Sequence, residues 1–314
     1  MKAVKAIQGQ PRLVDVPPPG GDGVQVRVVS SSICGSDLHM LELGFFGDAV
    51  IGHEFAGIAP DGRAVAVEPT LGCGICHHCE EGARQHCDNG LRILGVFEDG
   101  GMAEYVNVPA DNLVELPTGL AVADAALVEP LAVAVHGLDR TRIRQGDKVL
   151  VVGAGPIGLA AAAALQSRGI AYDISARYEH QREVAERLGG QAAVSDGYDV
   201  VLDAVGSTSS LEQSVNLVKP RGRVGMLGSF WSPVEISAAF CMKEAELIAS
   251  NTYRCRAPGR SFEEAGNLLA ERPGIARALV THRFPLDAVE EAFAVAADRS
   301  RGAIKVVFDV SPGA

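Results

Sequence analysis

The stretch that decides the fold is residues 149–158, which read VLVVGAGPIG. Four apolar residues predict a buried strand, Gly153, Gly155 and Gly158 follow with GxGxxG spacing, and an alanine-rich run to Arg168 predicts a helix. In such a turn the first glycine permits the bend, the second lets a pyrophosphate approach the backbone, and the third lets the helix pack on the strand. The helix N-terminus attracts phosphates. We therefore predict a dinucleotide site, whose expected contact residues are Gly153, Gly155, Pro156, Ile157 and Gly158.

The sequence around this motif alternates between apolar runs and helical patterns. On its C-terminal side, strands are expected at residues 170–176, 199–203 and 224–227, and helices at 179–188 and 209–218. Strands that alternate with helices at this spacing predict βαβ units on a parallel sheet that is buried on both faces. The fold class is therefore α/β, with a doubly wound parallel sheet.

The two ends of the chain have a different texture. Short half-buried strands are expected at residues 24–30 and 62–67, and the tail combines helices near 260–270 and 286–297 with a closing strand at 303–308. At 314 residues the chain is long enough for two domains. We expect a β-rich domain, formed by residues 1–130 and 254–314, that is interrupted by a dinucleotide-binding domain at residues 131–253.

The end of the second predicted strand bears on the choice of cofactor. A site for NAD places Asp or Glu about 20 residues after the glycines, where the carboxylate binds the ribose 2′-hydroxyl. Here Arg177 stands at that place, with Ser175 beside it. A guanidinium suits a 2′-phosphate, so NADP(H) is the preferred cofactor and NAD(H) the alternative. Two other interpretations remain: Arg177 only begins a helix, or Asp173 acts as the selecting acid.

Four cysteines lie close together at residues 73–87, namely Cys73, Cys76, Cys79 and Cys87. Two-residue gaps let successive thiolates converge on one Zn²⁺ at about 2.3 Å. An iron–sulfur cluster or free thiols are the alternatives. Because four protein ligands close a tetrahedral shell, we predict a structural zinc site.

A second group of candidate ligands is mixed in chemistry. Cys34 opens the segment CGSDLH, His53 and Glu54 follow Gly52, and Glu129 comes much later. One thiolate, one imidazole and one or two carboxylates can leave a coordination position for water or substrate, as catalytic zinc requires. Taken alone, a cysteine is usually a small buried apolar residue. Its occurrence together with the other two motifs favours a second zinc ion.

At these residues the sequence resembles the zinc-containing medium-chain dehydrogenase/reductase family, more closely the polyol (sorbitol), butanediol and threonine dehydrogenase branch than liver-type alcohol dehydrogenase. The resemblance covers essentially the whole chain and includes residues 101–106, GMAEYV. It implies a GroES-like β-rich catalytic domain plus a Rossmann domain, and a homo-oligomer, either a dimer or a tetramer. Loops around residues 57–65 and 192–198 are shorter than is usual for the family, which affects the expected substrate cleft and oligomer contacts.

The resemblance also implies roles for single residues. Cys34, His53, Glu54 and Glu129 would surround the catalytic zinc, some of them through water, and Glu129 matches the branch in which a glutamate replaces a cysteine ligand. Asp37 would orient His53 from behind. With the four-cysteine loop, this implies two zinc ions per chain.

A hydroxyl group must lose its proton before its carbon can give up a hydride. Zinc lowers the pKa of bound water from about 16 to about 7, and the same Lewis acidity should act on an alcohol. Ser36 can then take part in a hydrogen bond with the reacting hydroxyl, and His39 can pass the proton to solvent through the cofactor ribose. His39 as a plain surface residue, and a relay through water and Glu129, are the alternatives.

Composition excludes several other classes of function. A net charge of −11 argues against nucleic-acid partners and anionic membrane surfaces. No apolar run reaches the 18 or so residues of a membrane span, and the N-terminus lacks the pattern of a signal peptide, so a cytoplasmic enzyme is expected. Its partner would be a small alcohol or carbonyl compound.

The predicted function is therefore a zinc-dependent alcohol dehydrogenase or carbonyl reductase that acts on secondary alcohols or polyols with NADP(H). The alternative is an NAD(H)-dependent polyol or amino-alcohol dehydrogenase. A zinc-free quinone or enone reductase would lack the ligands Cys34 and His53. A catalytically silent nucleotide-binding regulator would be expected to have lost one of Cys34, Ser36, His53 or Glu129, and all four are present.

Overall fold

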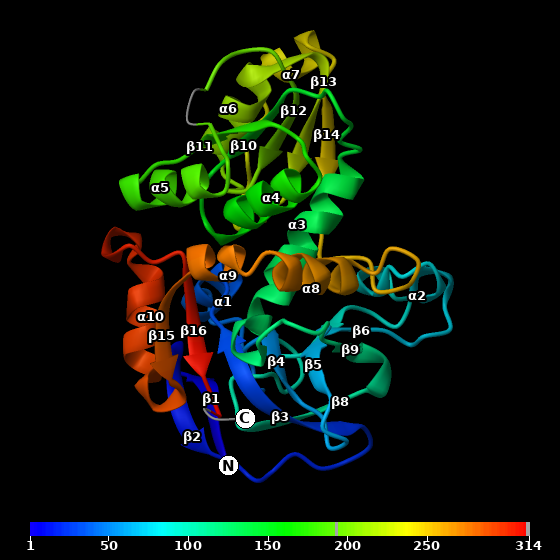
Figure 1. Ribbon diagram of the computed structural model, residues 1–314, viewed down its shortest axis with the longest axis vertical. Coiled ribbons are helices and arrows are strands. Elements are labelled where there is room, and N and C mark those ends of the chain that lie inside the picture. Colours follow the sequence, from blue (N-terminus) through cyan, green and yellow to red (C-terminus); the bar gives the residue numbers. More distant parts are fainter. Residues whose placement is uncertain (192–193, 312–314) are drawn as a thin grey trace. The chain divides into compact units, whose positions relative to one another are not determined.

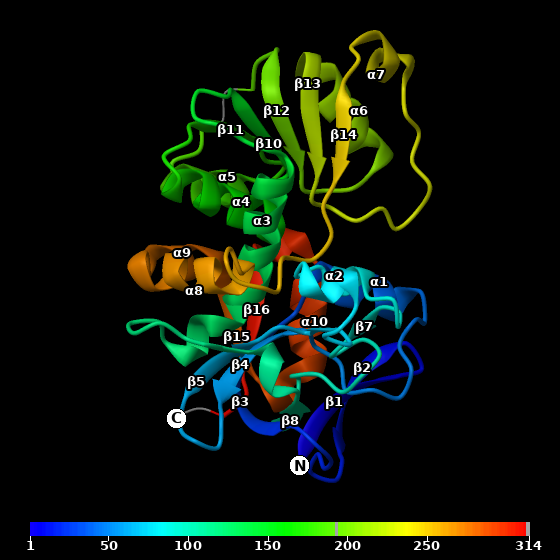
Figure 2. The same ribbon diagram turned by 90° about the vertical axis from the view of Figure 1, so that its right-hand side faces the viewer.

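The computed structural model describes residues 1–191 and 194–311. The chain forms two compact units: one contains residues 1–129 and those from 254 onward, and the other contains residues 130–253 (Figures 1 and 2). Helix α3 (Val128–Arg140) carries the chain from the first unit into the second. None of the described helices combines the length and the apolar composition that crossing a bilayer requires.

The second unit is a parallel sheet with helices between its strands, as predicted. The strand order is β11-β10-β12-β13-β14, and every pair of neighbours is parallel. The strands are β10 (Val149–Val152), β11 (Tyr172–Ser175), β12 (Tyr198–Asp203), β13 (Val218–Met226) and β14 (Glu246–Ala249). The helices are α4 (Pro156–Ser167), α5 (Glu179–Arg187), α6 (Thr208–Leu217) and α7 (Ala238–Met242). In Figure 1 these strands run side by side in one direction.

The glycine-rich turn has the geometry that its sequence predicts. Gly153 has φ +94°, a conformation that L side chains rarely adopt. A Cβ atom on Gly158 would lie 1.8 Å from the Gly153 carbonyl oxygen, so only glycine lets α4 approach β10 this closely. Gly155 caps the N-terminus of α4, and Pro156 begins it. The turn thus presents a helix N-terminus at the carboxyl end of a buried strand.

One strand of the usual dinucleotide-binding sheet is missing from the described residues. The six-stranded order is 3-2-1-4-5-6, and here β11 holds position 2 with a single bridge, Asp173 to Gln191, where a third strand would pair. The loop around residues 192–198, which is shorter than is usual for the family, follows Gln191. Residues 192 and 193 are not among the described residues. At this edge the Ile174 amide donates to the Gln191 carbonyl oxygen at 2.9 Å, and the Tyr198 hydroxyl donates to Asp173 Oδ2 at 2.6 Å and accepts from the Ser195 amide at 2.9 Å.

The first unit is built on a mostly antiparallel sheet of seven strands. The order is β15-β16-β3-β4-β5-β9, and β8 pairs with β3. The strands are β3 (Val24–Ser32), β4 (Glu54–Ile58), β5 (Ala64–Val67), β8 (Tyr105–Val108), β9 (Leu113–Glu115), β15 (Val280–Pro285) and β16 (Lys305–Asp309). Two small pairs lie outside it: β1 (Lys2–Ile7) with β2 (Gln10–Asp15), and β6 (Thr70–Leu71) with β7 (Arg92–Ile93).

The N-terminal and C-terminal parts of the chain pair with each other in this sheet. β16 runs antiparallel to β3, with Val307 opposite Ser32, and the red strand lies beside the blue one in Figure 1. Phe293 and Phe308 from the tail pack in one buried cluster with Val4 and Ile33 from the N-terminal part. The helices of this unit are α1 (Gly35–Glu42), α2 (His77–Glu80), α8 (Ser261–Glu271), α9 (Gly274–Leu279) and α10 (Val289–Ala297). The tail therefore completes the first unit's core.

Candidate metal centres and cofactor-binding turn

Two adjacent strands bring the mixed group of ligands together. Cys34 follows β3 and caps α1, while His53 immediately precedes Glu54, the first residue of β4. Because β3 and β4 are antiparallel neighbours with Ser32 opposite Glu54, these side chains meet at one end of the pair. The ligand atoms of Cys34, His53 and Glu54 all lie within 4.8 Å of one another.

Asp37 fixes both Cys34 and His53 from behind. Its side chain is fully buried; Oδ2 accepts a hydrogen bond from the Cys34 amide at 2.9 Å, and Oδ1 lies 3.2 Å from His53 Nδ1. With Nδ1 directed at this carboxylate, His53 Nε2 is the nitrogen that remains for a metal ion. Ser36 Oγ lies 3.4 Å from that same Nε2. Asp37 and Ser36 thus lie at opposite nitrogen atoms of the one imidazole ring, that of the predicted ligand His53.

The charge around His53 favours a cation at this place. Burial acts to lower the pKa of the imidazole, but Asp37 and Cys34 outweigh it and raise the pKa well above its ordinary value. The surroundings of the buried imidazole therefore favour positive charge. Zn²⁺ can satisfy the same anionic surroundings, and a thiolate, an imidazole and a carboxylate are donors that it accepts.

Glu54 is fully buried, and its carboxylate is paired with the ammonium group of Lys305. Lys305, whose side chain is 2% exposed, donates to Glu54 Oε1 and Oε2 at 2.8 Å each and to the Ile33 carbonyl oxygen at 3.1 Å. The Ser32 hydroxyl donates to Glu54 Oε2 as well. Burial acts to lower the pKa of Lys305, but Glu54 and Cys34 raise it, so the ammonium stays charged.

Glu129 is the second predicted carboxylate, and it lies in the first turn of α3 with 8% exposure. It is outside the three-residue group within 4.8 Å, yet its charge interacts with His53, Glu54 and Lys305. Burial raises the pKa of Glu129 to about 8, with His53 opposing the rise and Glu54 adding to it. A carboxylate in such surroundings gains from a nearby metal cation.

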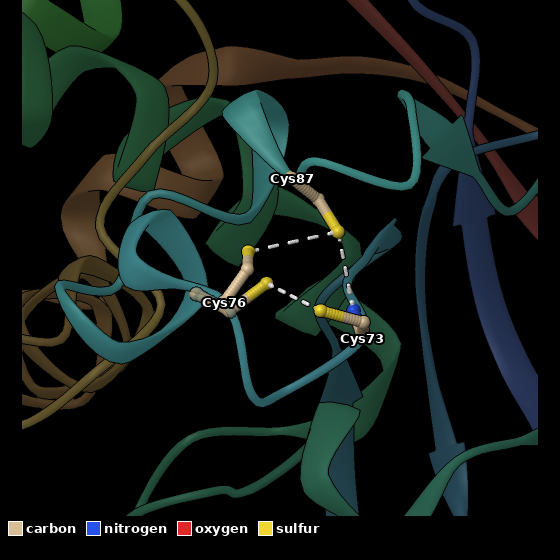
Figure 3. Close-up of side chains that lie close together, drawn as sticks. Cys73, Cys76 and Cys87 are labelled. Atoms are coloured by element: carbon tan, nitrogen blue, oxygen red, sulfur yellow. Dashed lines mark hydrogen bonds between the residues drawn. The ribbon is translucent and has the colours of Figure 1, made fainter.

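The four-cysteine loop forms a second, separate cluster, as the spacing predicts. The sulfur atoms of Cys73, Cys76 and Cys87 turn toward one another (Figure 3), and with Cys79 they lie within 4.8 Å. Two sulfur pairs, Cys73 with Cys79 and Cys76 with Cys87, are 4.0 Å apart. Sulfurs bound tetrahedrally at about 2.3 Å would be about 3.8 Å apart, whereas a disulfide requires about 2 Å. The loop therefore fits a zinc ion.

The residues that the sequence predicts to select the cofactor lie at the end of β11, which Ser175 closes, and just beyond it. Ser175 pairs with Val152 of β10, and its hydroxyl accepts a hydrogen bond from Gln213 at 3.3 Å. Arg177 is exposed, and its guanidinium carbon lies 5.5 Å above the Tyr178 ring. Asp173, the rival acid, faces Tyr198 instead, as described above. The exposed side chain that follows β11 is therefore a guanidinium, whereas the carboxylate of Asp173 is engaged by Tyr198.

His39 is exposed in the last turn of α1, on the same helix as Ser36. Sequence reasoning missed two residues that contact Glu54 of the mixed group of candidate ligands, Ser32 and Lys305. A signal for the second is present, since Lys305 interrupts the apolar closing strand. Its partner lies 251 residues earlier, so only the fold identifies it.

Comparison with known sequence families agrees with this arrangement. Residues 20–118 match the alcohol dehydrogenase GroES-like domain, and residues 122–310 match the family described as glucose dehydrogenase C-terminus. L-galactonate-5-dehydrogenase of Escherichia coli K12 is 32% identical over 314 aligned residues, which cover 89% of each chain.

Solved structures are similar over nearly the whole chain. A zinc-binding dehydrogenase of Sinorhizobium meliloti 1021 bound to NADP has a TM-score of 0.84 and 30% identity, with 98% of each chain covered. An alcohol dehydrogenase (rspB) of Escherichia coli CFT073 complexed with NADH has a TM-score of 0.86 and 27% identity, again over 98% of each chain. The shared features are the GroES-like unit and the dinucleotide-binding unit.

Proposed function

The chain belongs to the zinc-containing medium-chain dehydrogenase family, and on this premise we propose that it transfers a hydride between a secondary alcohol or polyol and NADP(H). In the direction of reduction, a ketone, NADPH and one proton give the alcohol and NADP⁺. We further propose two zinc ions per chain. The catalytic one is held by Cys34 and His53 with a carboxylate from Glu129 or Glu54, and the structural one by the four-cysteine loop.

The observation that carries this proposal is the position of Asp37. One buried carboxylate accepts a hydrogen bond from the backbone of Cys34 and lies 3.2 Å from the ring of His53, and the ligand atoms of Cys34 and His53 lie within 4.8 Å of each other. Ser36 Oγ lies beside Nε2 of that ring, which is where a reacting hydroxyl would need a hydrogen-bond partner. A structural zinc site needs no such polar group, because protein ligands close its shell and leave no position for a reacting hydroxyl.

When bound, zinc supplies the Lewis acidity that weakens the alcohol O–H bond, and the nicotinamide ring accepts the hydride. The residues of the chain move the proton. Ser36 forms the hydrogen bond to the reacting hydroxyl, and His39, exposed on the same helix, exchanges the proton with solvent. When bound, the cofactor ribose would supply a hydroxyl group for this proton path.

The proposed preference for NADP(H) rests on Arg177 and Ser175. A guanidinium can bind a 2′-phosphate through two charge-assisted hydrogen bonds, whereas a ribose hydroxyl gains little from it. The bond between Asp173 and Tyr198 supports this choice, since it engages the nearest carboxylate. Relatives of known structure carry NADP in one case and NADH in another, so the preference depends on this chain's own residues.

We also propose that the sequence-predicted segments 1–130 and 254–314 act as the catalytic zinc domain and residues 131–253 as the dinucleotide-binding domain. The expected substrate is a small alcohol or carbonyl compound. A homo-oligomer, either a dimer or a tetramer, is proposed by resemblance to the family.

A panel of ketones and polyols with both cofactors tests the proposed function. We expect oxidation of NADPH with at least one ketone, and a kcat/KM for NADPH at least about tenfold above that for NADH. Absence of turnover with every carbonyl, together with tight nucleotide binding, would instead indicate a regulator. Activity that persists after removal of all zinc would indicate a zinc-free reductase.

Replacing His39 by glutamine should slow alcohol oxidation most below neutral pH, where hydroxide cannot take the proton directly. The affinity for cofactor should stay nearly unchanged, because His39 is proposed to carry protons only. His77→Gln is the matched control, since that imidazole is also exposed and lies on the four-cysteine loop. The measurement is the pH profile of kcat; an unaltered profile would show that His39 is an ordinary surface residue.

A further inference from the structure

The guanidinium group of Arg177 lies over an aromatic ring. Its carbon atom is 5.5 Å from the centroid of the Tyr178 ring, a separation at which a cation is attracted to the ring face. In the described part of the chain, no carboxylate forms an ion pair with this guanidinium. A ring face occupies none of the five N–H donors of an arginine. The side chain therefore has a partner, and its hydrogen-bonding groups stay available for a ligand.

The carboxylates closest to Arg177 in the sequence have other partners. Two lie within five residues of it, Asp173 and Glu179. The Glu179 carboxylate pairs with the guanidinium of Arg182, whose Nε donates at 3.0 Å. Asp173 accepts a hydrogen bond from the Tyr198 hydroxyl at 2.6 Å. An acid paired with Arg177 would compete with an anionic ligand for the same donors, and neither of these acids does so.

The Tyr178 ring belongs to a residue that is itself held by its surroundings. Its amide donates to Gln181 Oε1 at 3.4 Å, and its carbonyl oxygen accepts from the amides of Gln181 and Arg182 at 3.2 Å each. The Gln181 side chain is buried. The ring stacks on that of His180, with centroids 5.6 Å apart and an angle of 21° between the planes. The first turn of α5 thus sets both the backbone and the ring of Tyr178.

We propose that Tyr178 is a positioning residue for cofactor selection, and that its ring holds the Arg177 guanidinium ready for the 2′-phosphate of NADP(H). Arg182 assists by pairing with Glu179, so that this carboxylate does not compete for Arg177. The inference rests on the proposed preference for NADP(H). An arginine that is already held loses less conformational freedom when it binds a phosphate, which strengthens the binding. The ring face leaves the N–H groups free for two parallel hydrogen bonds to phosphate oxygens.

The test measures the 2′-phosphate alone. Adenosine 2′,5′-bisphosphate and adenosine 5′-monophosphate differ only by that group, and their binding to the full chain requires no hydride transfer. The readout is the ratio of the two Kd values from calorimetry. In Tyr178→Leu the preference for the bisphosphate should fall about fivefold, since the cation–π attraction and the restraint on Arg177 are both lost. Tyr178→Phe keeps the ring, so its ratio should stay within about 1.5-fold of the wild type.

A second background tests whether the ring acts through Arg177. In Arg177→Ala protein, the further change Tyr178→Leu should leave the ratio unaltered, because the group that the ring positions is gone. An equal loss in both backgrounds would overturn the proposal. So would Tyr178→Leu with the wild-type ratio, which is the result expected if the ring only contacts adenine and weakens both ligands equally.

The pair formed by Glu179 and Arg182 has its own test. Arg182→Gln frees the Glu179 carboxylate to pair with Arg177, so the preference for the bisphosphate should fall at least about threefold. Adding Glu179→Gln should bring the ratio back to within about 1.5-fold of the wild type, since the competing acid is removed. An unchanged ratio in Arg182→Gln would overturn the assisting role of Arg182.

Tyr178 is half-buried, so thermal unfolding checks that each variant is folded. Tyr178→Met, which also lacks the ring, serves in place of Tyr178→Leu should that variant fail to fold, with the same expected fall in the ratio. Failure of the proposed cofactor preference has a different signature. Wild-type protein that binds both nucleotides equally well would overturn the preference for NADP(H) and this inference with it, whereas a wild type that favours the bisphosphate, with Tyr178→Leu unaltered, would overturn this inference alone.

Discussion

Replacement of Cys34 by alanine is expected to lower kcat at least about a thousandfold, because Lewis acidity contributes several kcal/mol and each 1.4 kcal/mol is a factor of ten in rate. Cys34 supplies the thiolate of the mixed site, and its backbone is held by Asp37. Its side chain is half-buried. Steady-state turnover with a reactive ketone measures the effect, and circular dichroism checks that the variant is folded.

Cys241→Ala is the matched control for this variant. Cys241 is a free, exposed cysteine of α7 and lies outside both sulfur-containing clusters. Its replacement should leave turnover within about twofold, as is usual for surface substitutions. Cys34→Ala protein that keeps more than about a tenth of the wild-type kcat would show that the chemistry does not depend on this thiolate.

Arg177→Asp is expected to raise the KM for NADP(H) by one to two orders of magnitude, because charge-assisted hydrogen bonds contribute about 1.5 to 3 kcal/mol each. The same change should lower the KM for NAD(H), since a carboxylate can accept a hydrogen bond from the free ribose hydroxyl. Arg177 is exposed at the end of β11, so the substitution should cost little stability. The readout is the ratio of the two kcat/KM values.

Arg187→Asp controls for the change in net charge. Arg187 is the last residue of α5 and is exposed, and its guanidinium donates a hydrogen bond to the carbonyl oxygen of Glu183, one turn earlier. Its variant should keep the wild-type cofactor ratio. A wild-type preference for NAD(H), or an Arg177→Asp variant with an unaltered ratio, would mean that Arg177 only begins the helix and that another residue selects the cofactor.

Features set by neighbouring residues could be predicted from the sequence. The turn at Gly153 and the start of α4 follow from sterics within ten residues, and helix α4 begins at Pro156, one residue from the expected position. The four-cysteine cluster follows from spacing alone, because short gaps leave the sulfurs few ways to be far apart. The parallel sheet was predicted from the alternation of strand and helix patterns.

Features set by distant parts of the chain could not be predicted. Lys305 meets Glu54 only because β16 returns to pair with β3, and no local pattern records that pairing. The same is true of the hydrogen bond between Tyr198 and Asp173, which joins two different strands of the parallel sheet. The sequence alone indicates that the loop around residues 192–198 is shorter than is usual for the family. Only the strand order indicates that the third strand of the usual sheet is what is missing from the described residues there.

The zinc content of the purified protein tests the central claim most directly, since it counts the closed site and the open site together. Elemental analysis should give two zinc ions per chain for the wild type and one for Cys34→Ala, with the remaining ion held by Cys73, Cys76, Cys79 and Cys87. Wild-type protein that is fully active with one zinc ion or none would contradict the account.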